Sequence, residues 1–150
     1  MTKKEKIQAF LSTREFAIAG VSRNKQKFGY TVFNELSKKG YTVYPINPNT
    51  DEIDGHKCYR SIKELPGNVN RLLIMTPKGS AIKIINEANT RGFDYIWFNQ
   101  KSESKEALRM TRNDNTKIIT NECILMFADP VEGFHKFHRF VRKVFGKLPK

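Results

Sequence analysis

The clearest chemical signal in the sequence is a glycine-containing turn that follows a short apolar run. The turn reads Gly20-Val21-Ser22-Arg23-Asn24-Lys25-Gln26-Lys27-Phe28-Gly29. Glycine permits a tight passage from a strand to a helix, and backbone N–H groups at the start of that helix suit a phosphate. Ser22 can donate a hydroxyl hydrogen bond, while Lys25 and Lys27 add positive charge. The turn therefore predicts a phosphate site, and a plain strand-to-helix turn with solvated lysines is the alternative.

The turn differs from two better-known phosphate motifs. It is not G-x-G-x-x-G, and it lacks the Gly-Lys-Ser/Thr ending of a P-loop. A typical NAD site also carries an acidic residue for the ribose hydroxyls after the second strand, where this chain has Asn47-Pro48. These differences count against ordinary NAD binding.

Further polar residues follow the other expected strands. Ligands of open α/β sheets bind at the carboxyl ends of the strands, so these positions join the turn as candidates. The alternative is loop chemistry, because Pro ends strands and Asn and Gln are common in turns. The candidate binding residues are Gly20, Val21, Ser22, Lys25, Lys27, Phe28, Gly29, Asn47, Pro48, Thr76, Pro77, Lys78, Asn99 and Gln100.

The elements that must position these residues alternate along the chain. Apolar runs and helical spacings predict strand and helix in turn from residue 16 to residue 120. This order predicts one three-layer, Rossmann-like α/β domain over residues 1–150, with a mostly parallel five-stranded sheet. Strands are expected over 16–21, 41–46, 71–75, 94–98 and 117–120, and helices over 3–11, 28–36, 80–90 and 102–112, with a helical turn at 61–65 and a polar, turn-rich stretch at 49–59.

The C-terminal segment predicts a basic amphipathic helix over 131–150. Its apolar stripe is Phe134, Phe137, Val141, Val144 and Leu148, and Lys136, Arg139 and Lys143 lie off that stripe. The stripe could pack on the domain itself, pair with a second copy or another protein, or lie on an anionic membrane surface. Packing on the domain is the usual case for such helices.

The order of motifs resembles the CoA-binding domain family, whose Rossmann-like members are similar to the CoA-binding domain of the succinyl-CoA synthetase alpha subunit. The second strand carries the most specific match, Gly40-Tyr41-Thr42-Val43-Tyr44-Pro45-Ile46-Asn47-Pro48. Further matches are Gly20, Ser22, Lys27, Gly29, Gly55, Tyr59, Ser61, Ile62, Trp97 and Gln100. The resemblance covers about residues 14–125. The family often has Pro within the loop that residues 23–26 form here.

The resemblance implies binding of coenzyme A or an acyl-CoA, without catalysis. Residues 20–22 would lie under the pyrophosphate, and Lys25 or Lys27 would neutralise its charge. Gly29 would let the helix start close to it. Residues 47–48 would flank the adenosine, and residues 76–77 would line the path of the pantetheine.

The positive charge leaves nucleic-acid binding open as another class of function. Lys and Arg number 27 against 15 Asp and Glu, a formal net charge of +12. The excess lies in residues 1–14, 22–39 and 131–150, and the rest of the chain is neutral. Basic patches bind phosphate backbones, but these pieces are separate in sequence and no recognition motif is present. Another nucleotide, such as NAD(H), bound by a regulatory protein is a further alternative.

Neither a catalytic centre nor a metal site is expected. His135, His138 and Cys123 could form a metal site, but zinc usually shows a second clear ligand pair. Cys123 could also be a reactive thiol, although free cysteines are commonly buried. Two cysteines, Cys58 and Cys123, make no disulfide framework, and no apolar run approaches the roughly 20 residues of a membrane helix. We therefore expect a cytoplasmic protein without a transmembrane segment.

Overall fold

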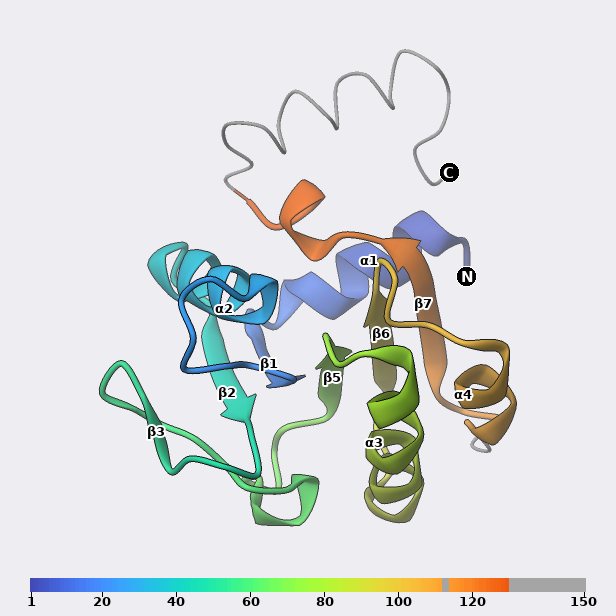
Figure 1. Ribbon diagram of the computed structural model, residues 1–150. Coiled ribbons are helices and arrows are strands. Elements are labelled where there is room, and N and C mark those ends of the chain that lie inside the picture. The colour runs from blue at the N-terminus through green and yellow to red at the C-terminus, as the bar shows by residue number, and fades with distance from the viewer. Residues whose placement is uncertain (112–113, 130–150) are drawn as a thin grey trace.

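The computed structural model describes residues 1–111 and 114–129, and its centre is a parallel sheet (Figure 1). All neighbouring strands run parallel, in the order β2-β1-β5-β6-β7. The expected α/β fold with a five-stranded sheet is confirmed, and no antiparallel pair joins this sheet in the described residues. The strands are β1 (Glu15–Ala19), β2 (Thr42–Ile46), β5 (Arg71–Ile74), β6 (Tyr95–Asn99) and β7 (Lys117–Glu122).

Helices cover both faces of the sheet and complete the three layers. α1 and α2 pack on one face, and α3 and α4 pack on the other. Alternate residues of a strand point to opposite faces, so each strand contributes to both cores. Phe16 and Ile18 of β1, for example, face α1 and α2. The helices are α1 (Lys3–Ser12), α2 (Phe28–Lys38), α3 (Lys78–Arg91) and α4 (Lys105–Met110), with short 3-10 turns η1 (Ile62–Glu64) and η2 (Ile124–Met126).

Residues 49–59 contain a small hairpin that the sequence prediction described only as turn-rich. Its strands are β3 (Glu52–Ile53) and β4 (His56–Lys57), joined by Asp54 and Gly55 with φ of 50° and 77°. Two-residue hairpin turns with positive φ at both positions favour Asp-Gly. The Tyr30 hydroxyl of α2 donates a hydrogen bond to the Asp54 carboxylate, which raises the pKa of Tyr30. This bond attaches the hairpin to α2.

The order of the strands creates a switch point between β1 and β5. From β1 the chain passes through α2 to β2 on one side. It then returns through the hairpin and η1 to β5, on the other side of β1. Successive connections thus diverge at the carboxyl ends of β1 and β5, where α/β proteins of this type form a ligand crevice.

The turn after β1 and the start of α2 are in direct contact at two glycines. Gly20 has a φ of +94°, and a Cβ added there would lie 2.8 Å from the backbone nitrogen of Thr76. A Cβ on Gly29 would lie 2.3 Å from the carbonyl oxygen of Gly20. Atoms at such distances overlap, so both positions require glycine. The two residues bring the first turn of α2 against the end of β1.

Two expectations fall outside the described residues. They are the basic amphipathic helix over 131–150 and, with it, the extent of the single domain to residue 150. Within 1–111 and 114–129, none of the helices combines the length and the apolar character needed to cross a bilayer.

Replacement of Gly29 by alanine tests the contact between the turn and α2. We expect Gly29→Ala to lower the free energy of unfolding by about 1–3 kcal/mol, because the new methyl group must push α2 away from Gly20. Urea denaturation followed by circular dichroism measures this.

The matched control is Gly79→Ala, in the first turn of α3, where an added Cβ meets no atom within 4 Å. This variant should stay within about 1 kcal/mol of the original protein, since alanine is the better helix former. Equal stability of the two variants would contradict the close contact.

Candidate functional site

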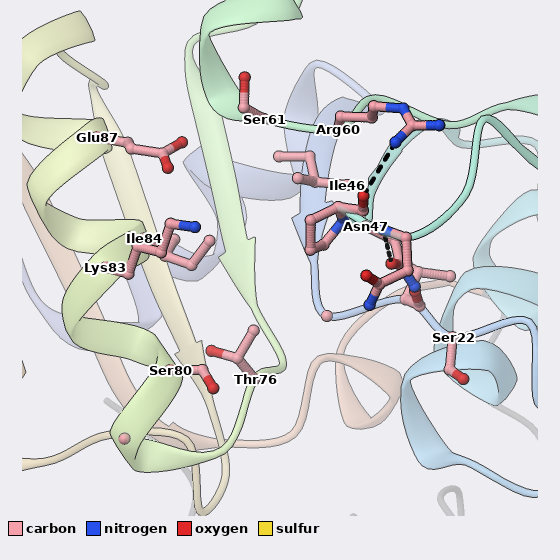
Figure 2. Close-up of a pocket in the computed structure, with 15 residues that line it drawn as sticks. Ser22, Ile46, Asn47, Arg60, Ser61, Thr76, Ser80, Lys83, Ile84 and Glu87 are labelled. Carbon is pink, nitrogen blue, oxygen red and sulfur yellow. Dashed lines mark hydrogen bonds between the residues drawn. The ribbon is translucent and has the colours of Figure 1, made fainter.

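A cavity of about 550 Å³ opens at the switch point (Figure 2). Its floor is the turn after β1, and its walls come from the ends of β2 and β5, the segment before η1, and α3. Figure 2 shows α3 on one side of the cavity, facing Asn47 and Arg60 on the other. The volume lies within the range of small-molecule and cofactor sites.

The floor is built by the glycine turn and is organised by its own side chains. Ser22 Oγ accepts a hydrogen bond from the Asn24 N–H at 3.0 Å. Asn24 Oδ1 in turn accepts from the Gln26 N–H at 2.9 Å. Ser22 uses a lone pair for this bond, so its hydroxyl proton remains able to point to a ligand. These two local turns shape the loop of residues 23–26. The family that the sequence resembles often has Pro in this loop.

The start of α2 lies beside this floor without a side-chain cap. Lys27 is the N-cap residue, and its side chain makes no capping hydrogen bond. The first turn of α2 also contains no acidic residue. The partial positive charge of a helix N-terminus is therefore not offset by a side chain of its own first turn. Lys25, Lys27 and Phe28 are exposed around it, with Phe28 47% exposed.

Asn47 connects the loop after β2 to the turn after β1. Its Nδ2 donates to the carbonyl of Val21 at 2.8 Å, and its Oδ1 accepts from the Asn49 N–H at 2.8 Å. An aspartate could accept from Asn49 but could not donate to Val21. The amide therefore has a structural reason to occupy a position where typical NAD sites use a carboxylate.

Arg60 forms part of the wall that adjoins β2. Its Nε donates to Asp51 at 2.7 Å, and a second guanidinium nitrogen donates to the same carboxylate at 3.1 Å. A third contact reaches the carbonyl of Pro48 at 3.4 Å. The hydrogen bonds and charge of Arg60 hold the pKa of Asp51 below its usual range. The pair fixes a guanidinium at the cavity rim.

The opposite wall is one face of α3. Its side chains recur at the three- and four-residue intervals that align residues along a helix. They belong to Ser80, Lys83, Ile84 and Glu87. At the foot of this wall, Thr76 Oγ1 is buried and has no hydrogen-bond partner among the described residues. A buried hydroxyl without a hydrogen-bond partner destabilises the folded state. A ligand group that hydrogen-bonds to Thr76 Oγ1 would remove this cost.

The structure brings together part of the candidate set. Lining the cavity are Gly20, Val21, Ser22, Asn47, Pro48 and Thr76. Outside the lining are Lys25, Lys27, Phe28 and Gly29, in the turn and the start of α2, and Pro77 and Lys78, the N-cap and first residue of α3. Contact of any of these residues with a ligand remains a prediction.

Asn99 and Gln100 lie outside the lining of this cavity. Asn99 is buried, and its Oδ1 accepts a hydrogen bond from the Ile124 N–H at 3.0 Å. It thereby joins the end of β6 to η2. Gln100 is exposed next to it. The hydrogen bond to Ile124 thus gives Asn99 a structural role, in addition to the ligand-binding role that the sequence predicted.

Sequence reasoning missed the walls formed by Arg60 and by α3. The lining residues outside the candidate set are Ile46, Asn49, Arg60, Ser61, Gly79, Ser80, Lys83, Ile84 and Glu87. Ser61 was matched to the family pattern but not assigned to the site. Ser80, Lys83 and Glu87 belong to the polar face of the predicted helix over 80–90, but helical spacing alone does not show that this face meets the cavity.

The cysteines are buried, as expected for free thiols. Cys123 is 5% exposed, and burial raises the pKa of its thiol. Burial also raises the pKa of the Cys58 thiol. In residues 1–111 and 114–129, no group of three His, Cys, Asp or Glu residues is placed to hold a metal ion. His135 and His138 lie outside the described residues.

Two curated proteins are similar to this chain in sequence. The alpha subunit of ADP-forming acetate–CoA ligase II from Pyrococcus furiosus is 32% identical over 126 residues, which cover 77% of this chain. The chain spans 28% of that subunit's length. YneT of Bacillus subtilis, an uncharacterised protein, is 23% identical over 82% of this chain and 91% of its own.

A solved structure is similar as well. A conserved hypothetical protein from Pyrococcus furiosus is 37% identical, with a TM-score of 0.70 over 74% of this chain and 96% of its own. The CoA binding domain family matches residues 14–129, which include every element from β1 to η2. The match and the fold together establish that this chain belongs to the CoA binding domain family.

Proposed function

We propose that the chain binds coenzyme A or an acyl-CoA in the cavity at the carboxyl ends of β1, β2 and β5. The observation that carries the proposal is the pair of close glycine contacts that sets an uncapped helix N-terminus against the cavity floor. Membership of the CoA binding domain family supports the same ligand. CoA combines a pyrophosphate, an adenosine and a long neutral arm.

The pyrophosphate would lie on residues 20–22, opposite the start of α2. Backbone N–H groups there, the Ser22 hydroxyl and the positive end of the helix all favour an anion. Lys25 and Lys27, exposed on the same loop, would add long-range attraction that is screened by salt. This placement accounts for the excess positive charge of the first loop.

The adenosine would extend along the wall that carries Asn47 and Pro48, and the pantetheine would leave past Thr76 and Pro77. Thr76 Oγ1 has no hydrogen-bond partner within residues 1–111 and 114–129, which supports a polar ligand group at that exit. Asn47 is already hydrogen-bonded to Val21 and Asn49, so it would position the loop more than it would read the ribose.

The proposal contains no catalytic step and includes a protein partner. The Pyrococcus furiosus relative is a ligase subunit, but this chain spans 28% of it, so ligase activity is not part of the proposal. A relative that acts as the alpha subunit of an enzyme supports association with another protein. Two buried free thiols suit a reducing compartment such as the cytoplasm.

A ligand panel measured by thermal shift tests the proposed function. CoA should raise the unfolding temperature. At a free CoA concentration of 100 times the dissociation constant, binding adds about 2.7 kcal/mol to the free energy of unfolding. NAD should have little effect. Duplex DNA should bind weakly and lose that binding as salt rises. A shift with duplex DNA and none with CoA would contradict the proposal, whereas cleavage of a CoA thioester by the protein would contradict its non-catalytic part.

Neutralising the two loop lysines tests the charge at the floor. The double variant Lys25→Ala, Lys27→Ala should weaken CoA binding by about 5- to 30-fold, since each exposed charge contributes up to about 1 kcal/mol. Isothermal titration calorimetry at two salt concentrations measures this, and the salt dependence should fall in the variant. Lys38→Ala, an exposed lysine in the last turn of the same helix, is the control and should bind as the original protein does. An equal loss of CoA affinity in the double variant and in Lys38→Ala would rule out a local role of Lys25 and Lys27.

A further inference from the structure

The cavity contains a carboxylate that a phosphate-rich ligand does not explain. Among the described lining residues, Glu87 alone is acidic. It lies seven residues after Ser80 on α3, which corresponds to about 10 Å along the helix. Figure 2 shows Ser80 near Thr76 and Glu87 at the far end of the same wall, close to Ser61. Glu87 is therefore well separated from the floor where the phosphates are proposed.

Glu87 is held in place with one oxygen left for a ligand. Its Oε2 accepts a hydrogen bond from the backbone N–H of Ile62 at 3.3 Å, so the carboxylate is anchored to η1. In the described part of the chain, no protein donor contacts Oε1. An ionised carboxylate only accepts hydrogen bonds. A ligand group at this end of the cavity must accordingly donate one.

The surroundings of Glu87 suit a flat apolar ring. Ile84 precedes it by one turn on the same face of α3, and Ile46 and Pro48 line the opposite wall. In Figure 2, Ile84 and Ile46 face each other across the cavity. A purine base placed between these side chains would bury its faces and present its edge to Glu87. Adenine carries a hydrogen-bond donor, the 6-amino group, on that edge.

We propose that Glu87 is a specificity-determining residue that accepts a hydrogen bond from the 6-amino group of adenine, with the ring packed between Ile84 and the Ile46–Pro48 wall. This inference rests on the proposed binding of CoA. It assigns the α3 wall, which the sequence did not identify, to recognition of the base. A base without a donor on that edge leaves the carboxylate facing the ligand without a partner.

The test compares ADP with purine riboside 5′-diphosphate, which lacks the 6-amino group, by isothermal titration calorimetry. Hydrogen bonds to charged groups contribute roughly 1.5–3 kcal/mol, so ADP should bind about 10- to 100-fold more tightly. In Glu87→Gln, the amide oxygen can keep the bond from Ile62, and its NH2 then faces the base. The preference for ADP should fall to about 2-fold or less, and Glu87→Ala should show the same loss.

The ratio of the two affinities separates recognition from a structural role. If Glu87 only supported η1, its variants would weaken both ligands equally and leave the ratio unchanged, which would overturn the inference. An equal affinity of the original protein for both ligands would overturn it as well. Glu106→Gln, an exposed glutamate of α4, removes the same charge outside the cavity and should keep the ratio.

CoA titrated in the same experiment distinguishes the two proposals. If CoA binds while ADP and the purine analogue are not discriminated, the role of Glu87 is wrong and the proposed function stands. If CoA does not bind, the proposed function is wrong, and the inference that rests on it is wrong too.

Discussion

The proposed site depends on two contacts at which backbone segments approach each other more closely than a side chain permits. The carbonyl of Gly20 occupies the space that a Cβ on Gly29 would need, and the backbone of Thr76 occupies the corresponding space beside Gly20. The end of β1, the start of α2 and the end of β5 are thereby brought to one point. The contact places the positive end of α2 next to the turn that forms the cavity floor. The remaining walls are then built around a fixed floor.

Polar contacts hold the loops around that floor. Polar contacts elsewhere show that the basic residues of the chain have different roles. Neutral hydrogen bonds from Asn47 and within residues 22–26 shape the loops. Some basic residues have structural partners elsewhere: Lys3 pairs with the buried Glu122 at 3.5 Å, and Lys6 reaches the carbonyl of Ile118. The net charge of +12 therefore has no single function. Part of it suits phosphates at the first loop, and part attaches α1 to β7.

The sequence predicted what local signals determine and missed what packing determines. The glycine turn and the residues after β2 were predictable because their chemistry is local. Asp54-Gly55 was a local hairpin signal too, but the prediction did not use it. The α3 wall was not predictable, because helical spacing does not say which face meets the cavity. Ile84 packs against the core on this face of the sheet and also lines the cavity beside Lys83. Asn99 was predicted to bind the ligand because it is polar and ends a strand. In the structure its side chain accepts a hydrogen bond from the backbone N–H of Ile124 and lies outside the cavity lining.

The central claim is that CoA occupies the cavity at the switch point, and its most direct test is an NMR titration of the 15N-labelled protein with CoA. The account predicts that the amide resonances of residues 20–22, 28–30, 47, 49, 76 and 78–80 shift first, and that those of 83–87 shift with them. Shifts confined to other surfaces, such as α1 and β7, would contradict the account, as would an unchanged spectrum at saturating CoA.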